Sequence, residues 1–390
     1  MIMNALLARI DPERIAALTL DLVRIPSPTG DTAAVAARFS AALAEAGMEV
    51  EQFTGFPRTP VVIGRRRGGP GPSLIFNGHL DTVPVPHADP ERRGDRIYGR
   101  GAADMKGALA AAVEAVRVLS EHPGGFPGEV QIIAHGLHEA PGGHAEDLSA
   151  AIRAGRVRGD GCLVCETGEH ALPVAQLGLG IFTAVFRRPG SVTHELQTPP
   201  GTPNPIYAAA AFAGALRLLN EHLSTRELPY VGSESVFIGQ LHAGDFYNRF
   251  PIEAQIQGTR RYAPQRDADE VARELTDLAQ RSAAQYGVTG ELTFDKVRDG
   301  FQITPDHPLV QAVRDAYTAV TGRELPLTGN KVVADAGIFA READIPAVYH
   351  GPAGEGAHGD VESVPIAELA RAARVYVAAA WRFLGAEKGE

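Results

Sequence analysis

An imidazole and two carboxylates stand in two short segments of this chain. The first, Asn77–Pro84 (NGHLDTVP), follows an apolar run and contains His79 and Asp81. The second, Gly99–Gly107 (GRGAADMKG), contains Asp104 and leads into an alanine-rich stretch. A histidine and an aspartate after a buried strand, with another aspartate where a helix begins, are how an α/β scaffold gathers ligands for a first-row metal ion. These residues therefore predict a metal site.

Four further segments offer ligand-type side chains where strands are expected to end. They are Leu137–Gly143 (LHEAPGG), Val164–Gly168 (VCETG), Asp335 and Gly351–His358 (GPAGEGAH). Mixed imidazole and carboxylate ligands suit zinc, and manganese or cobalt can also use them. Two such ions, roughly 3.5–4 Å apart and bridged by a carboxylate, can turn water into a nucleophile and polarise a carbonyl group.

Helix and strand signals alternate in the first third of the chain. Asp11 is expected to cap a helix whose first position is Pro12 and which stops at Pro26. Asp31 is expected to open a second helix, which Gly47 ends. A third, alanine-rich helix is expected over Lys106–Leu119, and strands over Glu49–Phe53, Val61–Arg65, Leu74–Phe76, Val130–Ala134 and Cys162–Cys165. This alternation indicates an α/β sheet with helices on its faces.

The middle of the chain has a different order, β-α-β-β-α-β, which is that of a ferredoxin-like unit. The expected elements are Ile181–Arg187, Asn204–Leu223, Ser235–Leu241, Ile252–Tyr262, Ala268–Tyr286 and Glu291–Val297. The earlier alternation then resumes with Leu309–Thr321, Ala347–Tyr349 and a final helix, Ile366–Phe383. We therefore expect an α/β fold. A metal-binding catalytic domain, residues 1–178 and 298–390, has a central mixed sheet flanked by helices and carries an inserted α+β domain, residues 179–297.

Composition excludes several classes of protein. The chain has 390 residues and a net charge of −10, so a nucleic-acid backbone or an anionic membrane would repel it on average. No apolar run approaches the roughly 18 residues of a membrane-spanning helix. Charged residues at Asp11, Glu13 and Arg14 interrupt the first segment before a secretory signal could form. These features predict a cytoplasmic protein that binds neither nucleic acid nor membrane.

Two other features have both a structural and a functional interpretation. Cys162 and Cys165 form a C-x-x-C pair, which could hold zinc or a disulfide. In the buried strand expected there, residues three apart point to opposite faces, so the thiols could not chelate one ion. The basic segment Arg65–Pro72 could bind phosphate, but it lacks aromatic residues and does not lead into a helix. A solvated hairpin loop is expected instead.

The segments around His79 and Asp104 resemble the M20 family of metallopeptidases, which includes acetylornithine and succinyl-diaminopimelate deacylases, aminoacylases and carboxypeptidase G2. The resemblance rests on G-H-x-D-x-V-P followed by G-R-G-x-x-D-M-K-G and covers essentially the whole chain. It implies a zinc-dependent hydrolase with two ions per subunit, with cobalt or manganese as alternatives. It also implies that the inserted domain is a lid through which two subunits form a homodimer.

The resemblance further implies a role for each matching residue. His79 would bind one metal ion, and Asp81 would lie behind it, hydrogen-bond it and fix its tautomer. Asp104 would bridge both ions. Glu166 matches the carboxylate that shares an ion with His79, and His358 matches the imidazole on the other ion.

Three matching residues lie in the inserted domain. Gly190–His194 matches the family's G-x-x-x-H, in which the histidine reaches the other subunit's site and steadies an oxyanion. His194 would therefore take part in catalysis. Asn248 and Arg261 match positions that hold the substrate's carboxylate and carbonyl.

One motif departs from the family. The family has two adjacent glutamates, the first a general base and the second a metal ligand, whereas this chain has only Glu139. If Gly142 and Gly143 set the alignment, Glu139 is the base and Ala140 replaces the ligand. If the preceding strand and the spacing from Asp104 set it, Glu139 is the ligand and His138 takes the base position. A histidine can accept a proton near neutral pH, whereas alanine can ligate nothing, which favours the second alignment.

The leading function is hydrolysis of the amide bond of an N-acyl amino acid or small peptide by metal-activated water. The altered base motivates a second function, in which the same scaffold cleaves a carbamoyl group or an aryl amide, or deaminates its substrate. The third is a binding protein that has lost turnover. His138, Glu139 and His144 do not form a helical zincin motif, because Pro141 interrupts any helix. The chain has no G-x-S-x-G nucleophile elbow and lacks the third glycine of a Rossmann fingerprint.

Overall fold

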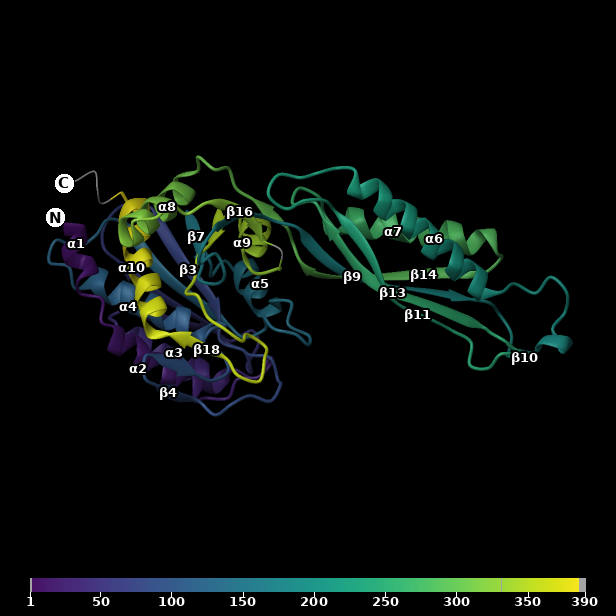
Figure 1. The fold of residues 1–390 in the computed structure, drawn as a ribbon, viewed down its shortest axis with the longest axis horizontal. Helices are drawn as coiled ribbons and strands as arrows, with labels where there is room; N and C mark the ends of the chain where they lie inside the picture. Colours follow the sequence, from purple (N-terminus) through teal and green to yellow (C-terminus); the bar gives the residue numbers. More distant parts are fainter. Residues whose placement is uncertain (1, 331, 386–390) are drawn as a thin grey trace. The chain divides into compact units, whose positions relative to one another are not determined.

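The computed structural model describes residues 2–330 and 332–385, which form two compact units (Figure 1). The first unit comprises the chain up to Val174, then Ile303–Thr328, and the chain from Ala334 onward. The second, inserted unit comprises Ala175–Gln302 together with the short segment Gly329–Val333.

A six-stranded mixed sheet forms the centre of the first unit. Its strand order is β1 (Glu49–Phe53), β2 (Val61–Arg67), β6 (Glu129–His135), β3 (Ser73–His79), β7 (Gly161–Val164) and β17 (Ala347–Tyr349). Strands β1 and β2 pair antiparallel with their neighbours, whereas β6, β3, β7 and β17 run parallel to one another. The carboxyl ends of these four parallel strands therefore meet at one edge of the sheet, which is where open α/β sheets bind ligands.

Helices cover both faces of this sheet. They are α2 (Pro12–Val23), α3 (Ala33–Glu45), α4 (Lys106–Ser120), α5 (Glu146–Arg153), α8 (Pro308–Thr321), α9 (Ala336–Glu342) and α10 (Ile366–Phe383). Helix α4 packs on β3 and β6, α3 on β1 and β2, and α9 on β7 and β17. Consecutive residues Leu74, Ile75 and Phe76 of β3 are all fully buried, as a central parallel strand requires. Burying each such side chain contributes roughly 1.5–3 kcal/mol.

The helix boundaries follow the capping signals, with one correction. Asp11 caps α2 as expected, since its carboxylate accepts hydrogen bonds from the backbone N–H groups of Glu13 and Arg14. The expectation that Asp31 opens the second helix is wrong, because Thr32 is the N-cap of α3. Asp31 instead accepts a hydrogen bond from the guanidinium of Arg58, with Nη2 3.1 Å from Oδ2. An ion pair has therefore replaced the capping bond.

Smaller elements complete the first unit. They are α1 (Ile2–Leu7) and the three-stranded sheet of β18 (Ser363–Pro365), β5 (Arg96–Tyr98) and β4 (Glu91–Arg93). A further three-stranded sheet has the order β15 (Phe301–Gln302), β8 (Leu172–Gln176) and β16 (Leu327–Asn330), and its residues are divided between the two units. Cys162 lies in β7, and Cys165 follows the strand; both are buried free thiols. In the described part of the chain, no helix is both long and apolar enough to span a bilayer.

The inserted unit is a four-stranded antiparallel sheet of order β11 (Ser235–Ala243), β13 (Glu253–Tyr262), β9 (Gly178–Arg187) and β14 (Thr289–Arg298). Figure 1 shows α6 (Pro205–Ser224) and α7 (Ala268–Gln285) side by side over one face of this sheet. The β-α-β-β-α-β order matches the expectation. Between sheet and helices, the Phe212 ring packs against the rings of Phe182 and Phe186, with centroids 6.3 and 5.6 Å away. Truncating such a buried phenylalanine to alanine costs roughly 3–5 kcal/mol.

Candidate metal centre

The ligand-type residues come from the carboxyl ends of the four parallel strands. His79 is the last residue of β3, and His138 and Glu139 lie in the loop after β6. Glu166 follows β7, and His358 lies in the loop after β17. Asp104 joins them from the turn that precedes α4. Residues separated by up to 279 positions in sequence are thus gathered at one sheet edge because four parallel strands end there.

Asp104 lies between two imidazoles. Its Oδ1 is 3.1 Å from Nε2 of His79, and its Oδ2 is 3.3 Å from Nε2 of His358. Nε2 of His358 is also 3.0 Å from Oε1 of Glu139, which is buried. Ligand atoms of His79, Asp104 and Glu139 all lie within 4.8 Å of one another. One carboxylate is therefore placed to serve two adjacent cation positions.

His138 and Glu166 lie on the other side of His79. The rings of His79 and His138 stack with centroids 4.1 Å apart and planes 6° from parallel. Nε2 of His138 is 3.9 Å from Oε2 of Glu166, and ligand atoms of these two residues and His79 also lie within 4.8 Å of one another. Oε2 of Glu166 is buried and accepts no hydrogen bond within the described residues. Burial raises the pKa of Glu166 above its ordinary value.

Asp81 contacts His79 differently from the expectation. Nδ1 of His79 donates to the backbone carbonyl of Asp81 at 2.9 Å, whereas the carboxylate Oδ1 is 3.5 Å away. The other carboxylate oxygen, Oδ2, accepts hydrogen bonds from the backbone N–H groups of His138 and Glu139, at 3.0 and 2.8 Å. Residue 81 therefore sets the tautomer of His79 chiefly through its main chain. Its side chain instead ties the β3 loop to the β6 loop.

A buried row of alternating acids and imidazoles leads away from His138. Nδ1 of His138 lies 3.1 and 3.2 Å from the two carboxylate oxygens of Asp335. Oδ2 of Asp335 is 2.7 Å from Nε2 of His135, whose Nδ1 is 3.2 Å from Asp147. Burial alone would lower the pKa of His135, but Asp335 and Asp147 together raise it to about 10. His135 therefore carries a positive charge between two carboxylates.

The loop that carries His358 is fixed to the turn that carries Asp104. Glu362 accepts hydrogen bonds at Oε1 from the backbone N–H groups of Ala103 and Asp104, and at Oε2 from Arg100 at 2.9 Å. Arg100 also donates to the backbone carbonyl of Gly359. A side chain at Gly354 would place its Cβ 2.3 Å from Cβ of Ala103, so only glycine permits this close approach.

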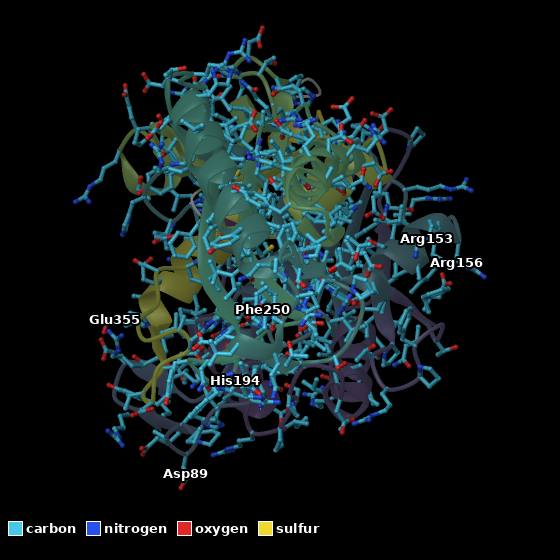
Figure 2. The ribbon with its side chains drawn as sticks, turned by 90° about the vertical axis from the view of Figure 1, so that its right-hand side faces the viewer. Asp89, Arg153, Arg156, His194, Phe250 and Glu355 are labelled. Carbon is cyan, nitrogen blue, oxygen red and sulfur yellow. The ribbon has the colours of Figure 1, made fainter. Side chains whose placement is uncertain are left out.

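Three of the predicted site residues lie in the inserted unit. The two-stranded ribbon of β10 (Thr193–His194) and β12 (Arg249–Phe250) presents His194, and Figure 2 shows His194 and Phe250 near each other there. Leu196 N–H donates to Nδ1 of His194 at 3.2 Å, and Nε2 of His194 lies 3.1 Å from the side-chain amide nitrogen of Asn248. Arg261 is half-buried on β13, where it lies opposite Ser235 of β11 and Leu179 of β9, and its substrate-binding role stays a prediction.

The donor set suits divalent cations. Asp104 and Glu139 have ligand atoms in one group with His79, and Glu166 has them in a second group that shares His79. Neighbouring carboxylates of this kind would repel one another without a counter-charge. The imidazoles are neutral ligands once deprotonated, and oxygen with nitrogen donors matches zinc, manganese or cobalt. The unsatisfied Oε2 of Glu166 supports this fit, because a buried carboxylate oxygen without a donor is otherwise costly.

Comparison with known proteins agrees with this donor set. Residues 75–382 match peptidase family M20/M25/M40. The chain belongs to this family. It is therefore a hydrolase of amide or peptide bonds that depends on divalent metal, as the motifs predicted. Both the predicted family and the predicted α/β fold with an inserted α+β unit are confirmed.

Relatives cover nearly the whole chain. A succinyl-diaminopimelate desuccinylase of Rhodospirillum centenum is 30% identical over 399 residues, which is 96% of this chain and 99% of that protein. Another, of Acinetobacter baylyi, is 29% identical over 378 residues, covering 92% and 96% of the two chains. The crystal structure of aminopeptidase PepT from Bacillus cereus has the same fold, with a TM-score of 0.78 at 21% identity over 96% of this chain and 99% of that one.

Sequence reasoning missed part of the centre. The sequence patterns indicate Asp335 only as a ligand-type residue and do not indicate His135. Asp147 and Glu362 were not considered. The signal available for Asp335 was its position just before α9, next to the strand ends. Neither Asp147 nor Glu362 follows a parallel strand, so strand ends could not have indicated them.

Proposed function

We propose that this protein hydrolyses the amide bond of an N-acylated amino acid or small peptide, using a pair of divalent cations, with zinc the expected metal. The observation that carries the proposal is the position of Asp104 between His79 and His358, with Glu166 beside His79 and Glu139 beside His358, at the ends of four parallel strands. The two relatives named as succinyl-diaminopimelate desuccinylases support an acylated amino acid as substrate.

We assign the ligands by proximity. Asp104 would bridge the two cations, because it lies between His79 and His358. Glu166 would complete the position next to His79, and Glu139 the position next to His358. When bound, the cations would supply a nucleophilic water at neutral pH and polarise the substrate carbonyl. This assignment follows the alignment in which Glu139 is a ligand.

His138 would then be the general base. Its Nδ1 faces Asp335, so Nε2 is the nitrogen that can accept the water's proton and return it to the leaving amine. The ring lies beside both His79 and Glu166, so a water held by these residues would be within its reach. Glu139 is engaged by His358 and is therefore less suited to carry this proton.

The inserted unit would complete the reaction. An N–H of the His194 imidazole is a hydrogen-bond donor suited to an oxyanion, and Asn248 beside it could hold a substrate carbonyl or carboxylate. Arg261 would bind the substrate's carboxylate. We propose a homodimer in which His194 serves the other subunit. The exposed side chains Phe237 and Leu241 on the edge strand β11 support a contact between subunits. The buried free thiols of Cys162 and Cys165 support a cytoplasmic location.

The test combines metal analysis with a substrate panel. Purified protein supplied with zinc should contain about two equivalents per chain. It should hydrolyse at least one of a set of N-succinyl, N-acetyl and dipeptide substrates. Full metal content with activity only on N-carbamoyl or aryl-amide substrates would replace the proposed substrate class. Metal-free protein without turnover of any substrate would contradict the proposal as a whole.

A further inference from the structure

We propose that Asp335 is a positioning residue that forms a histidine–aspartate dyad with His138, and that His135 and Asp147 hold Asp335 in place. This inference rests on the proposed function, because it assigns partners to the proposed base. His135 ends β6, His138 lies in the loop after it, Asp147 lies in the first turn of α5, and Asp335 is the N-cap of α9.

The contact between Asp335 and His138 fixes the tautomer of the imidazole. A carboxylate only accepts hydrogen bonds, so Nδ1 of His138, 3.1 Å from Oδ1, must carry the proton. The lone pair of the neutral ring is then on Nε2, which faces Glu166 at 3.9 Å. Without Asp335 either tautomer could form, and the Nε2–H form cannot accept a proton at the centre. Asp335 also places a negative charge next to the imidazolium that forms during turnover.

Asp335 is itself restrained from behind. His135, Asp147 and Asp335 have side chains with no exposed surface. Both ring nitrogens of His135 face carboxylates, at 2.7 Å from Asp335 and 3.2 Å from Asp147, so this ring donates in both directions. Asp147 is fixed in turn, since its oxygens accept from the backbone N–H groups of Gly136 and Leu148 at 2.8 Å. The chain of contacts therefore begins at backbone N–H groups, passes through Asp147, His135 and Asp335, and ends at the imidazole of His138.

The same atoms could be interpreted as another cation site, because His135, His138 and Asp335 have ligand atoms within 4.8 Å of one another. The hydrogen bonds argue against that interpretation. A ligand nitrogen must turn its lone pair to the cation, whereas both nitrogens of His135 lie at hydrogen-bond distance from carboxylates that need donors. The group is therefore a proton-bearing network rather than a second metal centre.

The experiment uses zinc-loaded protein with three variants and one control. Asp335→Ala removes the acceptor, and Asp335→Asn retains an acceptor of the same shape without its charge. His138→Gln removes the ring and identifies its resonances. Glu114→Gln is the matched control. Glu114 is a buried carboxylate on α4 that pairs with Arg14 of α2, and it belongs to none of the ligand groups. Each variant is measured for kcat, KM, zinc content and the ¹⁵N tautomer pattern of labelled histidine.

We expect the His138 ring of the unaltered protein to carry its proton on Nδ1, and an Nε2–H population to appear in Asp335→Ala. We expect kcat to fall about 10³-fold in Asp335→Ala and less in Asp335→Asn, with KM and zinc content within about twofold of the unaltered protein. Glu114→Gln should keep the kcat and the tautomer pattern.

Two results would overturn the inference. One is an Nε2–H tautomer of His138 in the unaltered, zinc-loaded protein. The other is unchanged kcat, or loss of zinc in proportion to loss of kcat, in Asp335→Asn, whose shape allows folding where Asp335→Ala fails. The tautomer is read without substrate, so failure of the proposed function, seen as no turnover by the unaltered protein, is recorded separately.

Discussion

The imidazoles of His79 and His138 stack at 4.1 Å and present the same edge to the acidic cluster. In each ring Nδ1 faces an oxygen, the backbone carbonyl of Asp81 in one and the carboxylate of Asp335 in the other. Nε2 of His79 consequently faces Asp104, and Nε2 of His138 faces Glu166. The two imidazoles thus differ in the oxygen that Nδ1 faces, because only in His138 does Nδ1 face a carboxylate at hydrogen-bond distance.

Replacement of His138 tests the proton-transfer role. His138→Ala should lower kcat by about 10²- to 10⁴-fold, the usual contribution of a general base, while the protein keeps its zinc. Zinc content and steady-state kinetics on the best substrate of the panel check this. His144→Ala is the control imidazole, because His144 lies six residues further along and belongs to none of the ligand groups. Loss of zinc from His138→Ala would make His138 a ligand instead of the base.

Replacement of Glu139 tests the alignment. Glu139→Gln should reduce the affinity for one of two zinc equivalents by more than about 10-fold, because the neutral amide replaces a charged donor beside His358. Titration of metal-free protein with zinc and a competing chelator measures both sites. Glu169→Gln, a glutamate outside the ligand groups, should bind zinc normally. Full occupancy of both sites in Glu139→Gln with no turnover would instead assign the base to Glu139.

Metal binding should release protons. Hydrogen bonding to Asp104 raises the pKa of His358 to about 9 in the metal-free protein. Burial alone would lower the pKa of His79, but its acidic partners raise it well above the ordinary value. His358 is therefore protonated at pH 7, and both rings must give up the protons that these carboxylates favour before they become ligands. Apparent zinc affinity should rise from pH 6.5 to about 9, and calorimetry in buffers of different ionisation enthalpy should detect the released protons. An affinity independent of pH would contradict this.

The charged His135 should make the stability of the metal-free protein depend on pH. Its folded pKa, about 10, lies above the roughly 6.5 of an unfolded histidine. The stabilisation is therefore fully present below about pH 6.5 and is lost as the pH rises toward 10. The loss should be on the order of a few kcal/mol. Urea unfolding at pH 6.5, 8 and 9.5 should show a smaller decrease in His135→Gln than in the unaltered protein, and equal decreases would argue against a charged His135.

Substitutions in the inserted unit should lower turnover without changing the zinc content. His194→Ala removes the imidazole N–H donor and should lower kcat by about 10²- to 10³-fold, with zinc content unchanged. Asn248→Ala should act in the same direction. His222→Ala is the matched control, since His222 is an exposed imidazole at the end of α6 in the same unit. A normal kcat in His194→Ala would remove this ribbon from the mechanism.

Strand ends explain why much of the site was predictable. His79, Glu139, Glu166 and His358 each follow an apolar run, and apolar runs between helices predict parallel strands whose ends meet. The same reasoning predicted the order of the inserted unit, because its alternating strands and two long amphipathic helices have distinct periods. The short strands of two or three residues carry too little pattern to be recognised.

The carboxylates that pair with His135 could not be predicted from the sequence, for a different reason. His135 is the last residue of β6, and its two carboxylates lie 12 and 200 residues away in sequence. Nothing local distinguishes a histidine held between two acids from a buried histidine without a functional partner. The same holds for Asp31 and Thr32, where the choice of cap depended on Arg58, 27 residues from Asp31. Pairings between distant side chains follow from the folded chain and not from periodicity.

The interruption of the first unit by Ala175–Gln302 has a consequence for synthesis on the ribosome. His79, Asp104, Glu139 and Glu166 emerge first, but β17 and His358 follow only after the whole inserted unit has been translated. The nascent chain therefore carries exposed parallel strands without their last neighbour while an independent antiparallel unit is being made. The supply of divalent metal late in translation, rather than early, should decide how efficiently newly made chains become active enzyme.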